Sequence, residues 1–292
     1  MANLKEIRIR IASVKSTRKI TSAMKMVAAA KLRKSQDKIV RMRPYANKLD
    51  DIILSLQQSL EGEIEHPLTQ DREPNKVLIV VFTSNRGLCG AFNSNAVKLA
   101  LNLAHTKYQK QLDKGELSFF SVGKKGAEQL SVRGYKIERE NHELLEGKGF
   151  EEISEFASEL MNYFVEEKFD RIEFVYNQFK NAVVQKLISE NFLPLKLEND
   201  DSVKKKFVDY IYEPNPSSLI INLVPKSLKI KVFKSILDSI ASEHGARMTA
   251  MHQATDNAND LIQELTLHYN KARQAAITKE ILDIVGGAEA LK

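Results

Sequence analysis

The residues that could do chemistry lie mainly in a glycine-rich turn that follows an apolar run. The turn reads Asn85-Arg86-Gly87-Leu88-Cys89-Gly90 and invites comparison with phosphate-binding loops. A P-loop needs Lys-Ser/Thr after its last glycine, and a dinucleotide-binding turn has another glycine spacing, so neither motif is matched. We interpret the segment as a tight turn between a strand and a helix.

Cys89 and the six histidines are the other candidates for nucleophilic or metal chemistry. A cysteine nucleophile needs a base nearby, and nothing in the sequence connects Cys89 with His105 or His142, the nearest histidines. The histidines form no i, i+4 pair on a helix and no cluster with acids that is typical of a metal site. We therefore expect no catalytic site, no cofactor and no metal, and we interpret Cys89 as a structural thiol.

Positive charge is concentrated near the N-terminus. The segment from Met1 to Arg43 holds 13 Lys and Arg residues against Glu6 and Asp37, whereas the whole chain has a net charge of +6. A strongly basic segment favours an acidic partner, which could be nucleic acid, anionic lipid or an acidic protein surface. Charge alone does not choose between these partners.

The first predicted element of the chain is a long helix. Residues 1–60 show a heptad pattern that is typical of a coiled-coil helix. Arg18, Lys25 and Ser35 interrupt the pattern, and Pro44 predicts a kink rather than an end. At ~1.5 Å per residue such a helix would span roughly 90 Å. The seam positions are Leu4, Ile7, Ile11, Val14, Thr21, Ala28, Leu32, Ile39, Met42, Ala46, Leu49, Ile53, Leu56 and Leu60.

The last part of the chain repeats this pattern. After Glu213-Pro214-Asn215-Pro216 we expect a short helix from Ser217, and Pro225 suits the first turn of a second helix. Gly286-Gly287 is the expected stop. The predicted seam positions are Ile230, Phe233, Leu237, Ile240, His244, Arg247, Met251, Ala254, Ala258, Leu261, Leu265, His268, Ala272, Ala275, Lys279 and Leu282.

The two terminal helices can pair only if they run antiparallel or if the middle of the chain folds back. Polar residues occupy four places in the predicted seam where apolar residues belong, so either the seam parts there or these side chains reach a partner. These residues are Arg18, Lys25, His244 and Arg247.

Residues 75–213 have a different pattern, typical of an α/β domain. Lys76–Phe82 reads as a buried strand, and Lys124-Lys125-Gly126 as a turn. Strands that alternate with helices favour a mostly parallel, Rossmann-like domain inserted between coiled-coil helices at 1–60 and 217–292. The fold class is thus α/β plus an antiparallel coiled coil. Further strands are expected at 117–122, 171–177, 183–188 and 207–212, and helices at 91–112 and 151–167.

Long motifs near both ends are the most specific features of the sequence. They are Ile20–Lys34 (ITSAMKMVAAAKLRK) and Ile277–Ala290 (ITKEILDIVGGAEA), and shorter ones are Arg86–Gly90, Tyr212–Pro214 and Ala254–Ala258. Together these motifs resemble those of the gamma subunits of bacterial F-type ATP synthases. The chain departs from the family pattern at Lys25, where the family has an acid, and no match is placed for residues 141–149. The long regulatory insertion of the chloroplast members is missing.

The resemblance implies a central rotor shaft that couples proton translocation to ATP synthesis or hydrolysis on other subunits. The terminal helices would form an antiparallel coiled coil inside a ring of three alpha and three beta subunits. The α/β domain would contact the epsilon subunit and the c-subunit ring. The subunit would have no catalytic site of its own. Candidates for contact with the alpha-beta ring are Arg33, Lys34, Arg247, Arg273, Gln274, Thr278 and Glu280.

The expected location is the cytoplasmic face of the bacterial inner membrane, as a peripheral protein. No apolar run is long enough to span a bilayer, and the first residues show no leader-like segment. Three alternatives remain open from the residues alone. A nucleic-acid-binding protein would use the basic helix, an α/β enzyme would use the middle domain, and a coiled-coil scaffold would use the two helices.

Overall fold

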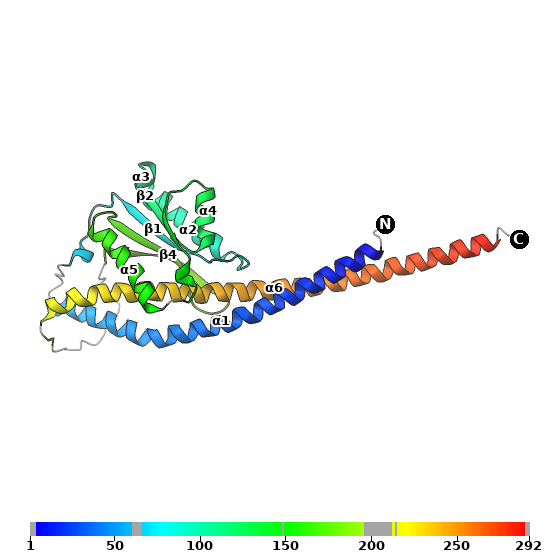
Figure 1. The fold of residues 1–292 in the computed structure, drawn as a ribbon, viewed down its shortest axis with the longest axis horizontal. Helices are drawn as coiled ribbons and strands as arrows, with labels where there is room; N and C mark the ends of the chain where they lie inside the picture. The colour runs from blue at the N-terminus through cyan, green and yellow to red at the C-terminus, as the bar shows by residue number, and fades with distance from the viewer. Residues whose placement is uncertain (1–3, 60–65, 148, 196–211, 214, 290–292) are drawn as a thin grey trace. The chain divides into compact units, whose positions relative to one another are not determined.

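The chain forms two compact units, and each unit contains a part of both long helices. Residues 1–29 and 247–292 make the first, which we call the helical unit, and residues 30–246 make the second, the sheet unit. Figure 1 shows the ribbon. The computed structural model describes residues 4–59, 66–147, 149–195, 212–213 and 215–289.

The sheet unit is built on one five-stranded sheet with the order β3-β2-β1-β4-β5. β1, β2, β3 and β4 are parallel, and β5 pairs antiparallel with β4. In the middle of the sheet, Val77 of β1 is aligned with Leu117 on one side and Arg171 on the other. Every residue of β1 is buried, because both faces of this strand are covered. The strands are β1 (Val77–Phe82), β2 (Leu117–Val122), β3 (Ile137–Asn141), β4 (Arg171–Phe179) and β5 (Gln185–Leu193).

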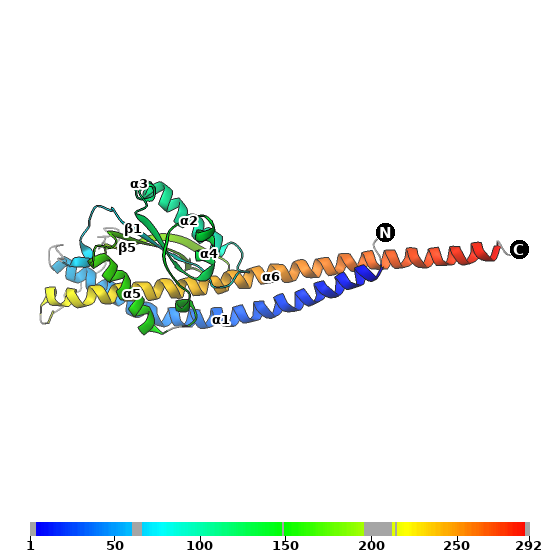
Figure 2. The same cartoon turned by 45° about the horizontal axis from the view of Figure 1, so that its top comes forward.

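Helices cover both faces of the sheet. α2 and α4 pack on one face, in a buried cluster that includes Ala96 and Leu130. α5 and α6 pack on the other face, in a cluster with Leu160 and Leu228, and Figures 1 and 2 show both helices on the same side of the sheet. The helices are α1 (Leu4–Ser59), η1 (Pro67–Thr69), α2 (Phe92–Lys107), α3 (Gln109–Asp113), α4 (Lys124–Val132), η2 (Glu143–Leu145), α5 (Phe150–Val165) and α6 (Pro216–Glu289).

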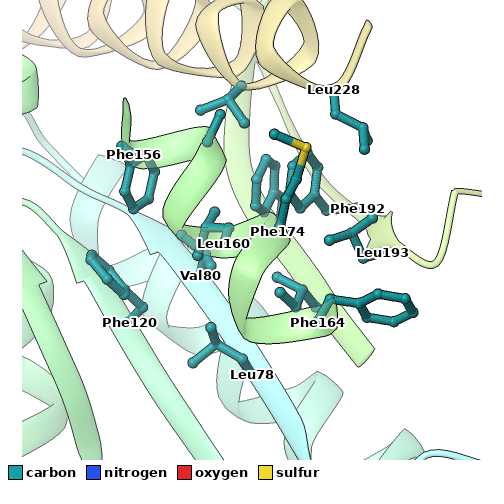
Figure 3. Close-up of a cluster of buried hydrophobic side chains, with 14 of the residues drawn as sticks. Leu78, Val80, Phe120, Phe156, Leu160, Phe164, Phe174, Phe192, Leu193 and Leu228 are labelled. Carbon is teal, nitrogen blue, oxygen red and sulfur yellow. The ribbon is translucent and has the colours of Figure 1, made fainter. Parts of the chain in front are cut away.

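The cluster on the α5 and α6 face is drawn in Figure 3. Phe174 of β4 and Phe192 of β5 stack there, with ring centroids 4.3 Å apart and an interplanar angle of 11°. Leu228 brings α6 into the same cluster. Full burial of a side chain of this size contributes ~1.5–3 kcal/mol. The cluster therefore holds α6 firmly against the sheet.

α6 runs through Pro225 as one helix, so the expected division into two helices is wrong. A proline has no N–H, and it therefore leaves the carbonyl four residues earlier, that of Ile221, without its helical bond. His66 supplies a substitute, because its side chain hydrogen-bonds the backbone of Ile221. Its Nδ1 accepts the Leu68 N–H at 3.1 Å, which leaves Nε2 to carry the donated proton. Val224, next to the proline, is fully buried and anchors this turn.

The strand expected from the sequence at 117–122 is confirmed as β2, and those expected at 76–82, 171–177 and 183–188 are confirmed with shifted ends as β1, β4 and β5. The helix expected at 91–112 is divided into α2 and α3 at Tyr108, and that expected at 151–167 is α5. Of the strand expected at 207–212, residues 207–211 lie outside the described residues, and Tyr212 is not in a strand.

The turn expected at Lys124-Lys125-Gly126 is wrong, because these residues open α4. Gly126 lies so close to the sheet that an added Cβ would be 2.6 Å from Ser121 Oγ and 2.7 Å from Thr83 Oγ1. The glycine therefore lets α4 start directly against the end of the sheet. β3 was not expected, because its sequence IEREN is mostly charged and lies at the sheet edge.

The heptad seam predicted for α1 is confirmed by burial, and Pro44 lies inside a continuous helix. The predicted seam position Leu60 lies outside the described residues. Buried seam positions are Thr21, Ala28, Leu32, Ser35, Ile39, Met42, Ala46, Leu49, Ile53 and Leu56.

Beyond Ala258 the seam predicted for α6 is partly wrong: Leu265 and Ala272 are half-buried as predicted, whereas the positions that alternate with them are shifted by one residue. Leu261 is exposed, whereas Ile262 is half-buried, and the same one-residue shift occurs at His268 and Tyr269. It recurs at Ala275 and Ala276, while the last predicted positions, Lys279 and Leu282, are both exposed. The expected stop at Gly286-Gly287 is also wrong, because α6 continues to Glu289. Neither glycine adopts the positive φ that ends a helix in a glycine cap.

Candidate functional site

The glycine-rich turn after β1 is packed by its own side chains. The Ser84 N–H donates to Asn93 Oδ1 at 2.8 Å, and Asn93 Nδ2 donates back to Ser84 Oγ at 2.8 Å. Asn93 Nδ2 also lies 3.3 Å from the Sγ atom of Cys89, which is 2% exposed. These side chains fill the end of β1, at the edge of the sheet where α/β proteins commonly hold ligands. The arrangement supports the interpretation of this segment as a structural turn.

Among the described residues, no group of three or more His, Cys, Asp or Glu side chains is placed to hold a metal ion. In the same part of the chain, no helix is both long and apolar enough to cross a membrane. An open cavity of about 460 Å³ lies between α5 and α6, and its lining is polar, with Glu155, Asn162 and Lys229 among its residues. The exposed surfaces of the long helices are the other candidate functional regions.

The first such surface is a basic face of α1 in the sheet unit. Arg33 and Lys34, two of the predicted contact residues, are exposed, and so are Lys38 and Arg41 on the same helix. The seam residues between them are buried, so the four cations lie on the side of α1 that faces solvent. We call these four residues the basic face. One exposed ion pair is worth only ~0–1 kcal/mol, so this face would act on a partner through several weak contacts.

The second surface belongs to the helical unit, where polar side chains join α1 and α6. Arg8 Nη2 donates to the hydroxyl of Tyr269 at 2.8 Å, and the guanidinium carbon lies 5.7 Å from the centre of the ring. This hydrogen bond lowers the pKa of the Tyr269 hydroxyl. The sequence did not single out either residue, although a basic and an aromatic residue on facing heptad positions would have been the signal.

Two further polar pairs share the same antiparallel register. Arg18 Nη1 donates to Asn259 Oδ1 at 3.1 Å, and the hydroxyl oxygens of Thr21 and Thr255 lie 2.8 Å apart. Of the two alternatives left open for Arg18, the structure shows the second, because its side chain reaches a partner on the other helix. The residue numbers of all three pairs add up to 276 or 277, which defines the alignment of the two helices.

This alignment places Leu4, the first described residue of α1, opposite about Arg273 of α6. From Gln274 onwards, no described residue of α1 faces α6. Four predicted contact residues lie at Arg273 or beyond it, and all four are exposed. They are Arg273, Gln274, Thr278 and Glu280. The Thr278 hydroxyl donates to the Gln274 carbonyl at 2.9 Å.

Arg247, the remaining predicted contact residue, is half-buried and lies far from the other four along α6. The structure thus brings together the candidates of the last turns but leaves Arg247 apart from them. Arg33 and Lys34 form a third location, in the sheet unit.

The last turns of α6 also present large apolar side chains to solvent, and these side chains were not among the predicted contacts. Their exposed fractions range from 47% for Ile277 to 70% for Ile284. Large contiguous apolar patches on a protein surface are typical of interaction sites. The signal in the sequence was an apolar pattern that continues into the last turns of α6. We call these residues the apolar end: Ile277, Ile281, Leu282, Ile284 and Val285.

Comparisons with known proteins agree on one family. A family model described as ATP synthase matches residues 3–291. The ATP synthase gamma chain of Flavobacterium johnsoniae is 53% identical over 291 residues, which are 100% of this chain and 99% of the relative. The gamma chain of Cytophaga hutchinsonii is 48% identical over 293 residues, with 100% and 99% coverage.

Solved structures show the same fold. A chain in the OSCP/F1/c-ring structure of the Euglena gracilis mitochondrial ATP synthase has a TM-score of 0.68 and 24% identity, covering 99% of this chain and 94% of that one. A chain of the Tetrahymena thermophila mitochondrial central stalk/c-ring structure has a TM-score of 0.58 and 24% identity, covering 80% and 99%. At this level of identity the likeness concerns the fold.

Proposed function

The chain belongs to the family of ATP synthase gamma chains, and from this membership we propose that it is the central rotor shaft of a bacterial F-type ATP synthase. In this role it couples proton translocation through the membrane sector to ATP synthesis or hydrolysis on a ring of three alpha and three beta subunits. The single structural observation that supports the role best is the exposed apolar end of α6, which no described residue of α1 faces.

The proposed shaft acts through contacts that differ between the conformations of the surrounding subunits. A ligand or a subunit can shift a conformational equilibrium only by as much as its interaction free energy differs between the two conformations. As the shaft turns, each beta subunit would meet a different face of α1 and α6 and bind nucleotide with a different affinity. The unequal lengths of the two helices in the helical unit supply the asymmetry that this requires. Catalysis would then take place on the neighbouring subunits.

The apolar end and the exposed polar residues beside it would lie inside the alpha-beta ring. Transfer of large apolar side chains from water into an apolar sleeve is favourable by ~25 cal/mol per Å² of buried area. Such contacts are not directional and would hold the end of α6 while it turns. Arg273, Gln274, Thr278 and Glu280 would add polar contacts at defined rotational positions. Arg247 would make a separate contact along the shaft.

The basic face of α1 would face acidic loops of the beta subunits, because its four cations are exposed. The α/β part of the sheet unit would bind the epsilon subunit and rest on the c-subunit ring. The protein would accordingly be a peripheral protein at the cytoplasmic face of the inner membrane.

Co-purification tests the proposal most directly. We expect a tagged copy of this chain, extracted from membranes of its source cell, to bring down alpha and beta subunits in three copies each, with epsilon and c. ATP hydrolysis should be found in the complex and be absent from the isolated chain. Hydrolysis by the isolated chain, free of alpha and beta, would contradict the proposed role. Salt-sensitive retention on DNA without alpha and beta would support the nucleic-acid alternative instead.

A further inference from the structure

A stripe of buried polar side chains runs along the face of α6 that packs on the sheet. Ser235, Asp238, Ser239 and Ser242 are between 0% and 3% exposed, and their spacing places them on one side of the helix. Polar groups buried in this way destabilise a fold unless they find hydrogen-bond partners. The proposed shaft function gives no role to the carboxyl group among them.

The stripe holds the hairpin formed by β4 and β5. The Ser242 hydroxyl donates to the Asn177 carbonyl at 2.9 Å, and Asp238 hydrogen-bonds the backbone of Phe179. One turn further on, a Cβ added to Gly245 would lie 3.1 Å from the Ala182 carbonyl oxygen. Successive turns of α6 therefore contact the end of β4 and the turn of the hairpin, and these contacts attach the hairpin to the helix.

Asp238 has charged or titratable groups around it on four elements. Lys234 of α6 and Arg43 of α1 attract the carboxylate, whereas Glu190 of β5 repels it. Tyr176 of β4 is close enough to interact electrostatically with the same carboxyl group. Burial is the largest influence, and it raises the pKa of Asp238 from 3.8 to about 6. The two cations, and the hydrogen bond to the backbone of Phe179 that also favours the carboxylate, do not offset the loss of hydration.

We propose that Asp238 makes the attachment of the β4–β5 hairpin to α6 sensitive to pH, and that the neutral acid holds the hairpin more tightly than the carboxylate does. When the hairpin opens, water reaches the carboxyl group and its pKa returns to the ordinary value. A group with a raised pKa in the closed state contributes stability that is complete below the ordinary pKa and is lost as the pH rises through the raised one. Acidification would therefore tighten the hairpin on the helix.

Hydrogen exchange of the hairpin amides in the full-length chain tests the proposal. After correction for the intrinsic rate, opening at the Phe179 amide should rise by up to about 100-fold between pH 4 and pH 7.5, tenfold for each unit of pKa shift. In Asp238→Asn the rise should disappear, and protection at pH 7.5 should exceed that of the wild type. Asp260→Asn, which removes an exposed carboxylate of the same helix, is the matched control and should behave like the wild type.

Carboxyl carbon-13 NMR of the wild-type chain gives a reading that does not depend on how a variant folds. The titration midpoint of Asp238 should lie near pH 6, and Glu190→Gln should lower it because one repelling charge is lost. A midpoint at or below pH 4, or a pH-dependent opening that persists in Asp238→Asn, overturns the proposal. Both measurements use the isolated chain, so their outcome is independent of the proposed shaft function.

Discussion

The same two helices are held together differently in the sheet unit and in the helical unit. In the sheet unit, α6 contributes fully buried apolar residues such as Val224, Leu228 and Val232, and the sheet and α5 complete the core. In the helical unit, hydrogen-bonded pairs such as Arg8 with Tyr269 join α1 and α6. Apolar burial supplies stability, whereas polar pairs in a coiled coil specify register at some cost in stability. The helical unit should therefore open first when the chain is destabilised.

The largest expected effect is in the core of the sheet unit. Phe174→Ala removes a fully buried ring that stacks on Phe192, and such substitutions cost ~3–5 kcal/mol. Denaturant unfolding followed by circular dichroism should show this loss in the more stable transition. Val132→Ala, at a side chain that is 88% exposed, is the control and should change stability by less than ~0.5 kcal/mol. An equal effect of the two substitutions would contradict the position of the core.

A carboxylate placed in the seam of the helical unit should have the next largest effect. Ile262 is half-buried and Leu261 is exposed, so Ile262→Asp should cost ~1–3 kcal/mol and Leu261→Asp much less. Thermal unfolding by circular dichroism measures both. The pair differs by one position on the same helix and by little in chemistry. A larger loss in Leu261→Asp would restore the seam predicted from the sequence.

His66→Ala should cost ~1–3 kcal/mol, because it leaves the backbone of Ile221 without the bond that Pro225 cannot supply. The effect depends on pH. Burial lowers the pKa of His66, so the stability it contributes is present above the ordinary pKa of 6.5 and is lost as the pH falls through the lowered value. The variant should lose less stability on acidification than the wild type. His268→Ala, at an exposed histidine, is the control, and equal acid sensitivity of the two variants would refute this account.

The smallest expected effect on stability is at the basic face. Replacing Arg33, Lys34, Lys38 and Arg41 by Gln should change the unfolding free energy by less than ~1 kcal/mol, because exposed charges contribute little. It should instead lower the proton pumping per ATP hydrolysed in inverted membrane vesicles, most clearly at low salt. Unchanged coupling at both low and high salt would show that these charges only keep the helix soluble.

The seam of α1 could be predicted from the sequence, because at most heptad positions only one apolar residue is available to occupy the seam. Beyond Ala258, every second seam position of α6 could not be predicted, because neighbouring residues such as Leu261 and Ile262 are equally apolar, whereas Leu265 was predicted correctly. Only the facing helix decides between them, through pairs such as Thr21 with Thr255.

Two other kinds of feature could not be predicted from the sequence: strands at the edge of the sheet, and hydrogen bonds between residues that are distant along the chain. β3 is mostly charged, and its alignment with β2 reveals it as a strand. The bond of His66 to Ile221 joins residues more than a hundred positions apart, so no local pattern predicts that α6 can pass through Pro225. Thr278 and Glu280 lie in the C-terminal motif and are exposed, whereas Arg247 lies outside the quoted motifs and is half-buried.

The part of α6 that no described residue of α1 faces has a consequence for the helix–coil equilibrium. From Gln274 to Glu289 this part measures about 16 residues, close to the length at which a single helix in water is only marginally stable. Gly286 and Gly287 weaken it further, by ~1 kcal/mol each relative to alanine. Enclosure of the apolar end by a partner would stabilise the helical conformation of these turns, because the side chains that the partner would bury lie on the same turns. Ordering of these last turns and association with a surrounding partner are thus one equilibrium, and the affinity for that partner includes the free energy of forming the helix.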